Sequence, residues 1–144
     1  MGNLGFRLLG GLHTRIYRLS GGKIGGKLGK APVLLLTTTG RKSGQQRTQP
    51  LLYTAAGDGY AVIASKGGAP HHPLWYLNLQ ADPSASVTVG RNTRQVRARD
   101  AEGEERETLW RAMTDQYAGY DQYAEKTTRQ IPVVVLDPAK PDMP

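Results

Sequence analysis

The sequence predicts a mainly β protein with peripheral helices, an α+β chain in which antiparallel strands form a barrel. Three observations predict this class. Six or so short runs are apolar and partly β-branched, glycine-containing turns separate them, and few segments have helical periodicity. The connections resemble hairpins rather than crossovers, which disfavours a doubly wound parallel sheet.

Residues 1–30 are expected to lie outside the barrel domain. Apolar residues recur at four-residue spacing among arginines and predict an amphipathic basic helix: Leu4, Leu8, Leu12 and Ile16. Residues 21–30 are rich in glycine and lysine and predict a mobile connector. We therefore divide the chain into residues 1–30 and a barrel domain of residues 31–144 that begins near Ala31.

Three strands are predicted in the first half of the domain. Residues 33–39 are apolar and partly β-branched, and a glycine-containing turn follows them. Residues 48–53 and 60–65 are the next two candidates, and Asp58-Gly59 between them suits a tight hairpin turn. Consecutive antiparallel pairing is the simplest topology for these strands.

Two helices and three strands are predicted in the second half. Residues 72–80 suit a short helix with Pro73 at an early position. Residues 86–89 and 94–99 predict a hairpin whose arginines Arg97 and Arg99 face water and whose inward side chains are Val87, Val89, Val96 and Ala98. Residues 102–117 predict a second helix, and residues 131–136 predict the last strand.

The composition limits the partners of the chain. Its 144 residues suit one barrel domain, and 19 basic against 12 acidic residues give a formal charge of +7. An anion is therefore an expected partner, and net charge alone leaves nucleic acid, an anionic membrane and a phosphorylated small molecule open. The chain has no cysteine, which excludes disulfides, thiolate nucleophiles and cysteine metal sites. Without a signal peptide or a span of membrane length, we expect a cytoplasmic protein.

Three tempting motifs do not carry the chemistry that they suggest. Residues 21–28 match a phosphate-binding loop except at the last position, where Leu28 replaces the serine or threonine that binds magnesium. His71-His72 has no third ligand at metal-binding spacing, so we expect no metal site. Ser43 and Ser65 lack the pentapeptide and partners of a hydrolase triad.

Two glycine-rich turns carry candidate anion-binding residues. Arg41, Lys42 and Arg47 lie on the turn between the first two strands, and Lys66 follows the third strand. Guanidinium, ammonium and exposed glycine amides together suit phosphate or carboxylate. Adjacent strand ends would bring the four cations into one pocket, whereas a solvated basic surface is the alternative interpretation.

The same turns belong to a series of motifs that resembles the deazaflavin-dependent nitroreductase family. The similarity extends through nearly all of residues 31–138. Its motifs, in order, are Thr-Thr-Gly-Arg-Lys-Ser-Gly at 38–44 with Arg47 and Pro50, Ala-Ser-Lys-Gly-Gly at 64–68, Pro-Leu-Trp-Tyr-Leu-Asn-Leu at 73–79, Ala-Asp-Pro at 81–83, Ala-Arg-Asp-Ala at 98–101, Glu-Glu-Arg at 104–106 and Arg-Gln-Ile-Pro-Val-Val-Val at 129–135.

The resemblance implies a split β-barrel of the flavin-reductase, FMN-binding type that holds the deazaflavin coenzyme F-420. Arg41, Lys42, Arg47 and Lys66 would then hold the phosphate and glutamates of its tail. The residues expected around the ring are Gln49, Pro50, Ser65, Gly67, Leu74, Trp75 and Asn78. Without the resemblance, Trp75 is interpreted as an ordinary core residue. FMN is the less favoured coenzyme.

The resemblance also implies an oxidoreductase that passes hydride from reduced F-420 to a quinone, an enone or a nitroaromatic acceptor. Tyr117, Tyr120 and Tyr123 recur every three residues, and we expect a stripe along one helix that forms the acceptor wall and a movable lid. Tyr117, Tyr120, Ser65 or water would supply the proton. Leu52 stands where well-known members have tyrosine, and Gln49 where they have asparagine, which puts nitroimidazole reduction in doubt.

Three further expectations concern partners. A small-molecule electron acceptor and a separate enzyme that reduces F-420 are implied by the coenzyme. A non-catalytic deazaflavin or flavin carrier, or a membrane-peripheral binding protein whose N-terminal helix contacts lipid weakly, is the alternative function. We expect no nucleic-acid binding, because the cations lie in glycine-rich loops that suit a small anion.

Overall fold

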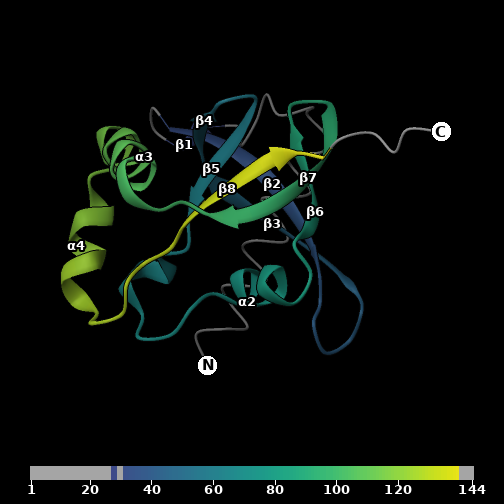
Figure 1. Ribbon diagram of the computed structural model, residues 1–144, viewed down its shortest axis with the longest axis horizontal. Helices are drawn as coiled ribbons and strands as arrows, with labels where there is room; N and C mark the ends of the chain where they lie inside the picture. The colour runs from purple at the N-terminus through teal and green to yellow at the C-terminus, as the bar shows by residue number, and fades with distance from the viewer. Residues whose placement is uncertain (1–26, 29–30, 140–144) are drawn as a thin grey trace.

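The computed structural model describes residues 27–28 and 31–139 (Figure 1). The strands among them are β1 (Lys27–Leu28), β2 (Ala31–Thr39), β3 (Gln46–Leu52), β4 (Thr54–Ala56), β5 (Gly59–Ile63), β6 (Ser84–Val89), β7 (Asn92–Asp100) and β8 (Val133–Pro138). The helices are the 3-10 turn η1 (Lys66–Gly68), α2 (Leu74–Ala81), α3 (Gly103–Gln116) and α4 (Gly119–Lys126). The predicted N-terminal helix lies outside the described residues, and β1 pairs with the start of β2 inside the segment that we expected to be a connector.

The strands close into a split barrel because one chain segment joins both ends of the sheet. In the strand order, β2, β6, β7, β8, β5 and β4 are successive neighbours, and β3 pairs with the other side of β2. Only Tyr53 separates β3 from β4, so the same segment pairs first with β2 and then with β5. Every pairing is antiparallel, and the predicted mainly β barrel with peripheral helices is confirmed.

Consecutive pairing was correct for the hairpins but wrong for the order of the whole sheet. β2 pairs with β3, β4 with β5, and β6 with β7, as adjacent strands do. β8, the last strand, instead lies between β5 and β7, and β6 returns to pair with β2. In this position between β5 and β7, β8 is buried on both faces, which explains its continuous apolar run from Val133 to Leu136.

Alternation along the strands divides the apolar side chains between two cores. Leu34 and Leu36 of β2 point into the barrel together with Val87 and Val96 of the predicted hairpin. Val89 and Ala98 pack against this inner core, while Arg97 and Arg99 are exposed as predicted. The outer core forms where α3 and α4 cover β5 and β8, and its main members are Ile63, Leu109, Met113, Tyr120 and Val135.

Helix α2 covers one end of the barrel (Figure 1). Its Trp75, Tyr76 and Leu79 are buried in the inner core. Pro73 is the N-cap of this helix rather than its first residue, which leaves the predicted bounds otherwise nearly unchanged. No helix in the described part of the chain is long and apolar enough to span a bilayer.

Candidate functional site

The loop between β2 and β3 presents the first group of cations. Arg41 and Lys42 lie at its tip and Arg47 lies near the start of β3, and all three are exposed. The loop is shaped by backbone bonds, since Gly40 N donates to Gln45 O at 2.8 Å and Gly44 N donates to Gly40 O at 2.8 Å. Gly44 has φ of 71°, a conformation that favours glycine.

Lys66 lies at the same end of the barrel but on a different loop. The chain direction of β5 is opposite to that of β3 and β4, so the end of β5 is close to the level at which β3 begins. Lys66 is exposed and has φ of 46°, and its Nζ donates to Nε2 of His71 at 2.8 Å. The structure thus places the four predicted cations at one end of the barrel. Three are on the β2–β3 loop and at the start of β3, and the fourth is on the loop that leads from β5 to α2.

Asn78 of α2 ties the cationic loop to the barrel. Its Oδ1 accepts a hydrogen bond from the backbone N of Arg41 at 3.1 Å, and its Nδ2 donates to Oγ1 of Thr38 at 3.2 Å. Asn78 and Thr38 are both buried. These bonds direct its carboxamide toward Arg41 and Thr38 and indicate that it positions the loop, while the contact of Asn78 with the coenzyme ring stays a prediction.

The other two α2 candidates have opposite exposures. Trp75 is 7% exposed and packs in the inner core, in agreement with the ordinary interpretation of this residue. Leu74, the first residue of α2, is 56% exposed and is the large hydrophobic side chain that the described surface leaves most open. An exposed leucine beside cationic loops suits a ligand that has an apolar part and an anionic part.

The candidate residues of strand β3 lie on opposite faces of the sheet. Gln49 lies on the inner face with Leu51, while Pro50 and Leu52 lie on the outer face. Leu52 packs against the outer core, of which Tyr120 is a buried member. Nε2 of Gln49 is buried and has no hydrogen-bond partner among the described residues. A buried amide donor without a partner is costly, so it indicates a missing acceptor.

The three tyrosines meet, although they do not form a stripe on one helix. Tyr117 ends α3 in an extended conformation, and the chain begins α4 at Gly119. The predicted single helix is therefore wrong. Folding nevertheless brings the phenol oxygens of Tyr117 and Tyr123 to 2.7 Å, and the ring of Tyr120 packs edge-on against both, with centroids at 5.2 and 6.1 Å.

The surroundings raise the pKa of two of these phenols, Tyr120 and Tyr123. Burial raises the pKa of the Tyr120 hydroxyl, and the neighbouring Tyr117 and Tyr123 raise it further. The hydrogen bond to Tyr117 is the main cause that raises the pKa of Tyr123, followed by burial. Neutral phenols donate protons and hydrogen bonds. Tyr117, Tyr120 and Tyr123, which we call the tyrosine wall, therefore suit a carbonyl acceptor that gains negative charge.

The loop after β5 brings Ser65 and Lys66 next to the tyrosine wall. Ser65 is 9% exposed, and it precedes η1. A Cβ added to Gly68 of η1 would lie 2.8 Å from the backbone oxygen of Tyr123, so η1 packs directly against α4. The turn that carries Lys66 and the helix that carries Tyr120 and Tyr123 are therefore adjacent.

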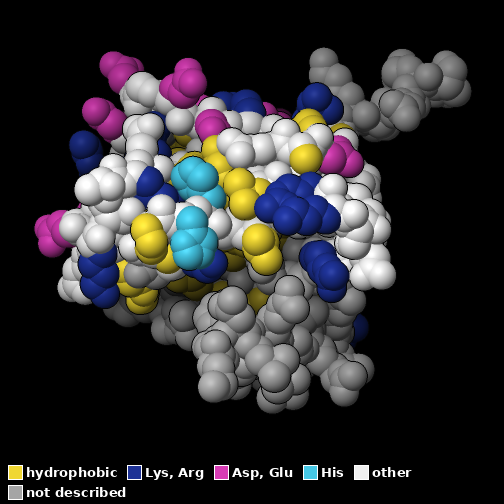
Figure 2. All heavy atoms as spheres, turned by 90° about the horizontal axis from the view of Figure 1, so that it is seen from below, with side chains coloured by type: hydrophobic (Ala, Val, Ile, Leu, Met, Phe, Trp, Pro, Cys, Tyr) yellow, Lys and Arg dark blue, Asp and Glu magenta, His cyan; other side chains and the backbone are white. Residues whose placement is uncertain are grey.

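Figure 2 shows this end of the molecule, with Lys and Arg side chains close to hydrophobic and histidine side chains.

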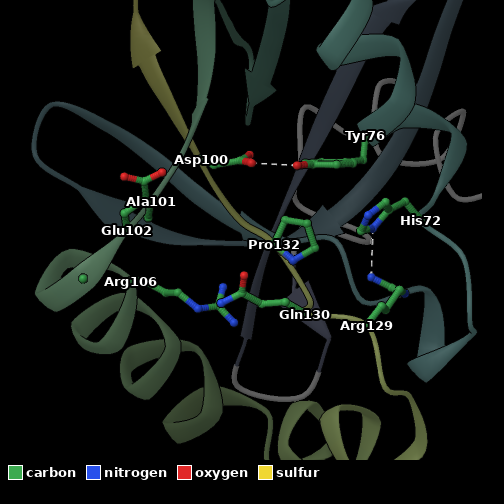
Figure 3. Close-up of a pocket in the computed structure, with 10 residues that line it drawn as sticks. His72, Tyr76, Asp100, Ala101, Glu102, Arg106, Arg129, Gln130 and Pro132 are labelled. Carbon is green, nitrogen blue, oxygen red and sulfur yellow. Dashed lines mark hydrogen bonds between the residues drawn. The ribbon is translucent and has the colours of Figure 1, made fainter.

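A second feature, which the sequence interpretation missed, lies at the corner between β7, α3 and the connection from α4 to β8 (Figure 3). It is a cavity of about 420 Å³ lined by His72, Tyr76, Asp100, Arg106, Arg129 and Gln130, among others. Arg129 had entered the sequence analysis only as part of a motif, because the spacing does not show what its side chain reaches.

Comparison with known proteins gives both sequence and structural relatives of this chain. The family model described as F-420H(2)-dependent quinone reductase matches residues 10–138. An F-420H(2)-dependent quinone reductase of Mycobacterium tuberculosis is 43% identical over 129 residues, which are 87% of this chain and 87% of the relative.

Solved structures extend the comparison to the fold. A structure described as an F-420-H2 dependent reductase matches with a TM-score of 0.68 and 45% identity, over 74% of this chain and 94% of the other. The heme storage protein HutZ of Vibrio cholerae matches with a TM-score of 0.58 at 17% identity, over 76% of this chain and 82% of the other. The second likeness shows a shared fold alone.

Proposed function

Because this chain belongs to the F-420H(2)-dependent quinone reductase family, we propose that it reduces a quinone at the junction of its cationic loops and its tyrosine wall. Family membership makes the chain an F-420-dependent oxidoreductase. The observation that supports the proposed site is the placement of Arg41, Lys42, Arg47 and Lys66 at one barrel end, together with the packing of η1, which contains Lys66, against α4. The non-catalytic carrier is the weaker alternative.

The chemistry of the residues fits the coenzyme. Four exposed cations suit a tail of phosphate and glutamates, and arginine forks suit planar or tetrahedral oxyanions. The unpartnered Nε2 of Gln49 offers a donor, and exposed Leu74 offers an apolar contact. We propose that Pro50, Ser65 and the backbone of Gly67 complete the contacts to the ring.

The bound coenzyme supplies a hydride, so the chain needs to bind the coenzyme and the quinone, orient them and supply a proton to the quinone. Tyr117, Tyr120 and Tyr123 form an apolar wall with phenolic donors, and we propose that a quinone lies against it. The quinone needs one proton for each hydride that it accepts. Tyr117, Tyr120 and Ser65 are the candidate donors, because each carries a hydroxyl group in this part of the structure.

Leu52 directs the choice of acceptor. Its side chain has no hydrogen-bonding group and packs against the outer core that includes Tyr120. We propose that this apolar contact favours quinones over nitroimidazoles, because the polar nitro group would lack a partner there. Leu52→Tyr should raise kcat/KM for a nitroimidazole relative to a naphthoquinone. An unchanged ratio would show that Leu52 does not select the acceptor.

Coenzyme binding is tested with oxidised F-420 and with FMN, followed by fluorescence. Wild-type protein should bind F-420 in preference to FMN, and Arg41→Ala combined with Lys42→Ala should weaken F-420 binding more than tenfold, since each lost charged bond costs about 1.5–3 kcal/mol. Arg91→Ala combined with Arg97→Ala removes the same charge from the exposed β6–β7 hairpin and is the matched control. Equal weakening by both pairs would indicate a nonspecific charge effect, and FMN binding alone would refute F-420 as coenzyme.

We further propose a weak membrane contact through residues 1–30, which lie almost wholly outside the described residues. The basis is the amphipathic basic pattern of Leu4 to Ile16. Full-length protein should sediment with anionic liposomes in a salt-sensitive way, and deletion of residues 1–26 should abolish this. Equal sedimentation of both proteins would exclude the helix as the contact.

A further inference from the structure

We propose that Arg129 is the positioning residue for the loop that carries Ser65 and Lys66, and that its bond to His72 makes coenzyme binding depend on pH. The inference rests on the proposed function, because it assigns a role to a residue that the expected coenzyme contacts do not include. Arg129 belongs to the connection between α4 and β8.

The guanidinium of Arg129 is surrounded by acceptors from the opposite loop. Its Nε donates to the carbonyl of Ala69 at 2.8 Å, NH1 to the carbonyl of Ala64 at 3.2 Å, and NH2 to the carbonyl of Ser65 at 2.6 Å. NH1 also lies 3.0 Å from Nδ1 of His72 (Figure 3). One side chain therefore binds both ends of the turn that contains η1.

These bonds add to those that the turn makes by itself, in which Gly68 N donates to Ser65 O at 3.0 Å. The turn leaves three carbonyls pointing to one side, and a rigid fork of donors can satisfy all of them at once. Lysine has the same charge but a single nitrogen, so it cannot reach the three carbonyls with the same geometry. The turn also contains Lys66 at φ of 46°, a conformation that the surroundings must hold.

Arg129 also connects the two halves of the proposed site. It follows α4, the helix that carries Tyr120 and Tyr123, by a few residues, and η1 packs against the same helix at Gly68. A shift of the Arg129 side chain would therefore move Lys66 relative to the tyrosine wall. The coenzyme tail and ring contacts depend on this spacing.

His72 adds the pH dependence. An arginine can only donate, so Nδ1 of His72 must be an unprotonated acceptor in this arrangement. Burial lowers the pKa of His72, the charge of Arg129 lowers it further, and Asp100 opposes them. The ring of Tyr76 lies at 4.8 Å on the other side. Protonation would place two donors face to face, so the bond is present above the lowered pKa and is lost as the pH falls through it.

Arg129→Lys tests the positioning role, with Arg91→Lys on the exposed β6–β7 hairpin as the matched control. Arg129→Lys should weaken F-420 binding by about tenfold and raise the KM for F-420H2, while kcat at saturating coenzyme stays within about twofold. Amide hydrogen exchange of residues 64–69 should become faster. The control should match wild type in all three measurements.

The pH dependence is tested with His72→Asn, whose amide oxygen takes the place of Nδ1 and accepts at every pH. Wild-type F-420 affinity should fall below pH 6.5, and the fall should be smaller in His72→Asn. Identical pH profiles would overturn the role of His72. Because both proteins bind the same coenzyme, titration of the coenzyme itself cancels from the comparison.

The outcomes separate this inference from the proposed function. Unchanged affinity and unchanged exchange in Arg129→Lys would overturn the inference and leave coenzyme binding intact. Faster exchange with unchanged affinity would make Arg129 a purely structural residue and would also overturn it. If wild-type protein does not bind F-420, the proposed function fails, and exchange of residues 64–69 still decides whether Arg129 holds the loop.

Discussion

Replacing Gly119 by alanine should disturb the acceptor wall without unfolding the protein. Gly119 begins α4, directly beneath the ring of Tyr117. A Cβ at this position would lie 2.5 Å from Cε2, 2.7 Å from Cζ and 2.9 Å from the hydroxyl oxygen of Tyr117. Ordinary contact begins near 3.4 Å, so the ring must move by about 0.9 Å.

That displacement is large enough to break the bond between the phenols. The oxygens of Tyr117 and Tyr123 are 2.7 Å apart, and a movement of about 0.9 Å away would leave about 3.6 Å, beyond hydrogen-bond distance. The lost bond costs about 0.5–1.5 kcal/mol, while alanine stabilises a helix over glycine by up to about 1 kcal/mol. We therefore expect a change in the free energy of unfolding below about 1 kcal/mol.

The effect should appear in the acceptor site instead. The KM for a naphthoquinone should rise about fivefold, which corresponds to about 1 kcal/mol, at an unchanged affinity for F-420. The pKa of Tyr123 should fall toward its ordinary value, because its hydrogen bond to Tyr117 is the main cause that raises it. NMR of tyrosine labelled at the ring carbon bound to oxygen measures this pKa directly.

Two variants separate the effect of the lost hydrogen bond from the effect of the displaced Tyr117 ring. Tyr123→Phe removes the bond without moving the ring of Tyr117, so it should reproduce only the part of the KM change that the bond contributes. In a Tyr117→Ala background, Gly119→Ala should have no further effect on KM, because the ring that it displaces is gone. A wild-type KM and an unchanged Tyr123 pKa in Gly119→Ala would refute the reasoning.

The remaining predictions concern stability and coenzyme binding. Gly59→Ala should destabilise the fold by more than about 2 kcal/mol, measured by urea denaturation, because the new Cβ would meet the backbone oxygen of Leu136, which cannot move as a side chain can. Burial and the bond to Asp100 raise the pKa of Tyr76 to about 12, so this bond stabilises the fold fully below pH 10 and is lost between pH 10 and about 12. Tyr76→Phe should therefore be about 1–2 kcal/mol less stable than wild type at pH 8, and it should lose less stability than wild type over that alkaline range. Parallel plots of unfolding free energy against pH for the two proteins would contradict this role of the Tyr76–Asp100 bond. Asn78→Ala should cost about 2 kcal/mol and weaken F-420 binding, and retention of wild-type affinity in a fluorescence titration would show that Asn78 does not position the cationic loop.

The strands could be predicted from the sequence because their signal is local. The predicted strands at residues 33–39, 48–53 and 94–99 correspond to β2, β3 and β7 with ends shifted by a few residues. Alternation also assigned the faces of the hairpin correctly, with Val96 buried and Arg97 exposed. A period of two residues is a property of each strand alone, so no partner is needed to detect it.

The arrangement of the site was harder to predict because it depends on pairs distant in sequence. The helical stripe of tyrosines was wrong, since α3 ends before Tyr117, yet the phenols meet because α4 folds back on α3. The bond between Asn78 and the backbone of Arg41 spans 37 residues, so spacing along the sequence does not reveal it. The carbonyls that bind Arg129 lie 60 to 65 residues away, and no spacing rule detects such contacts.

By itself, the sequence determined the set of local elements, the charge of the two loops and the resemblance to a coenzyme-binding family. The tertiary structure decided how these parts meet: the insertion of β8 between β5 and β7, the passage of one segment from β2 to β5 at Tyr53, and the binding of the turn at residues 64–69 by Arg129. The physical reason is the range of the interactions. Periodicity and turn chemistry act over a few residues, whereas barrel closure and the bonds of a partly buried guanidinium are selected only when distant segments pack together.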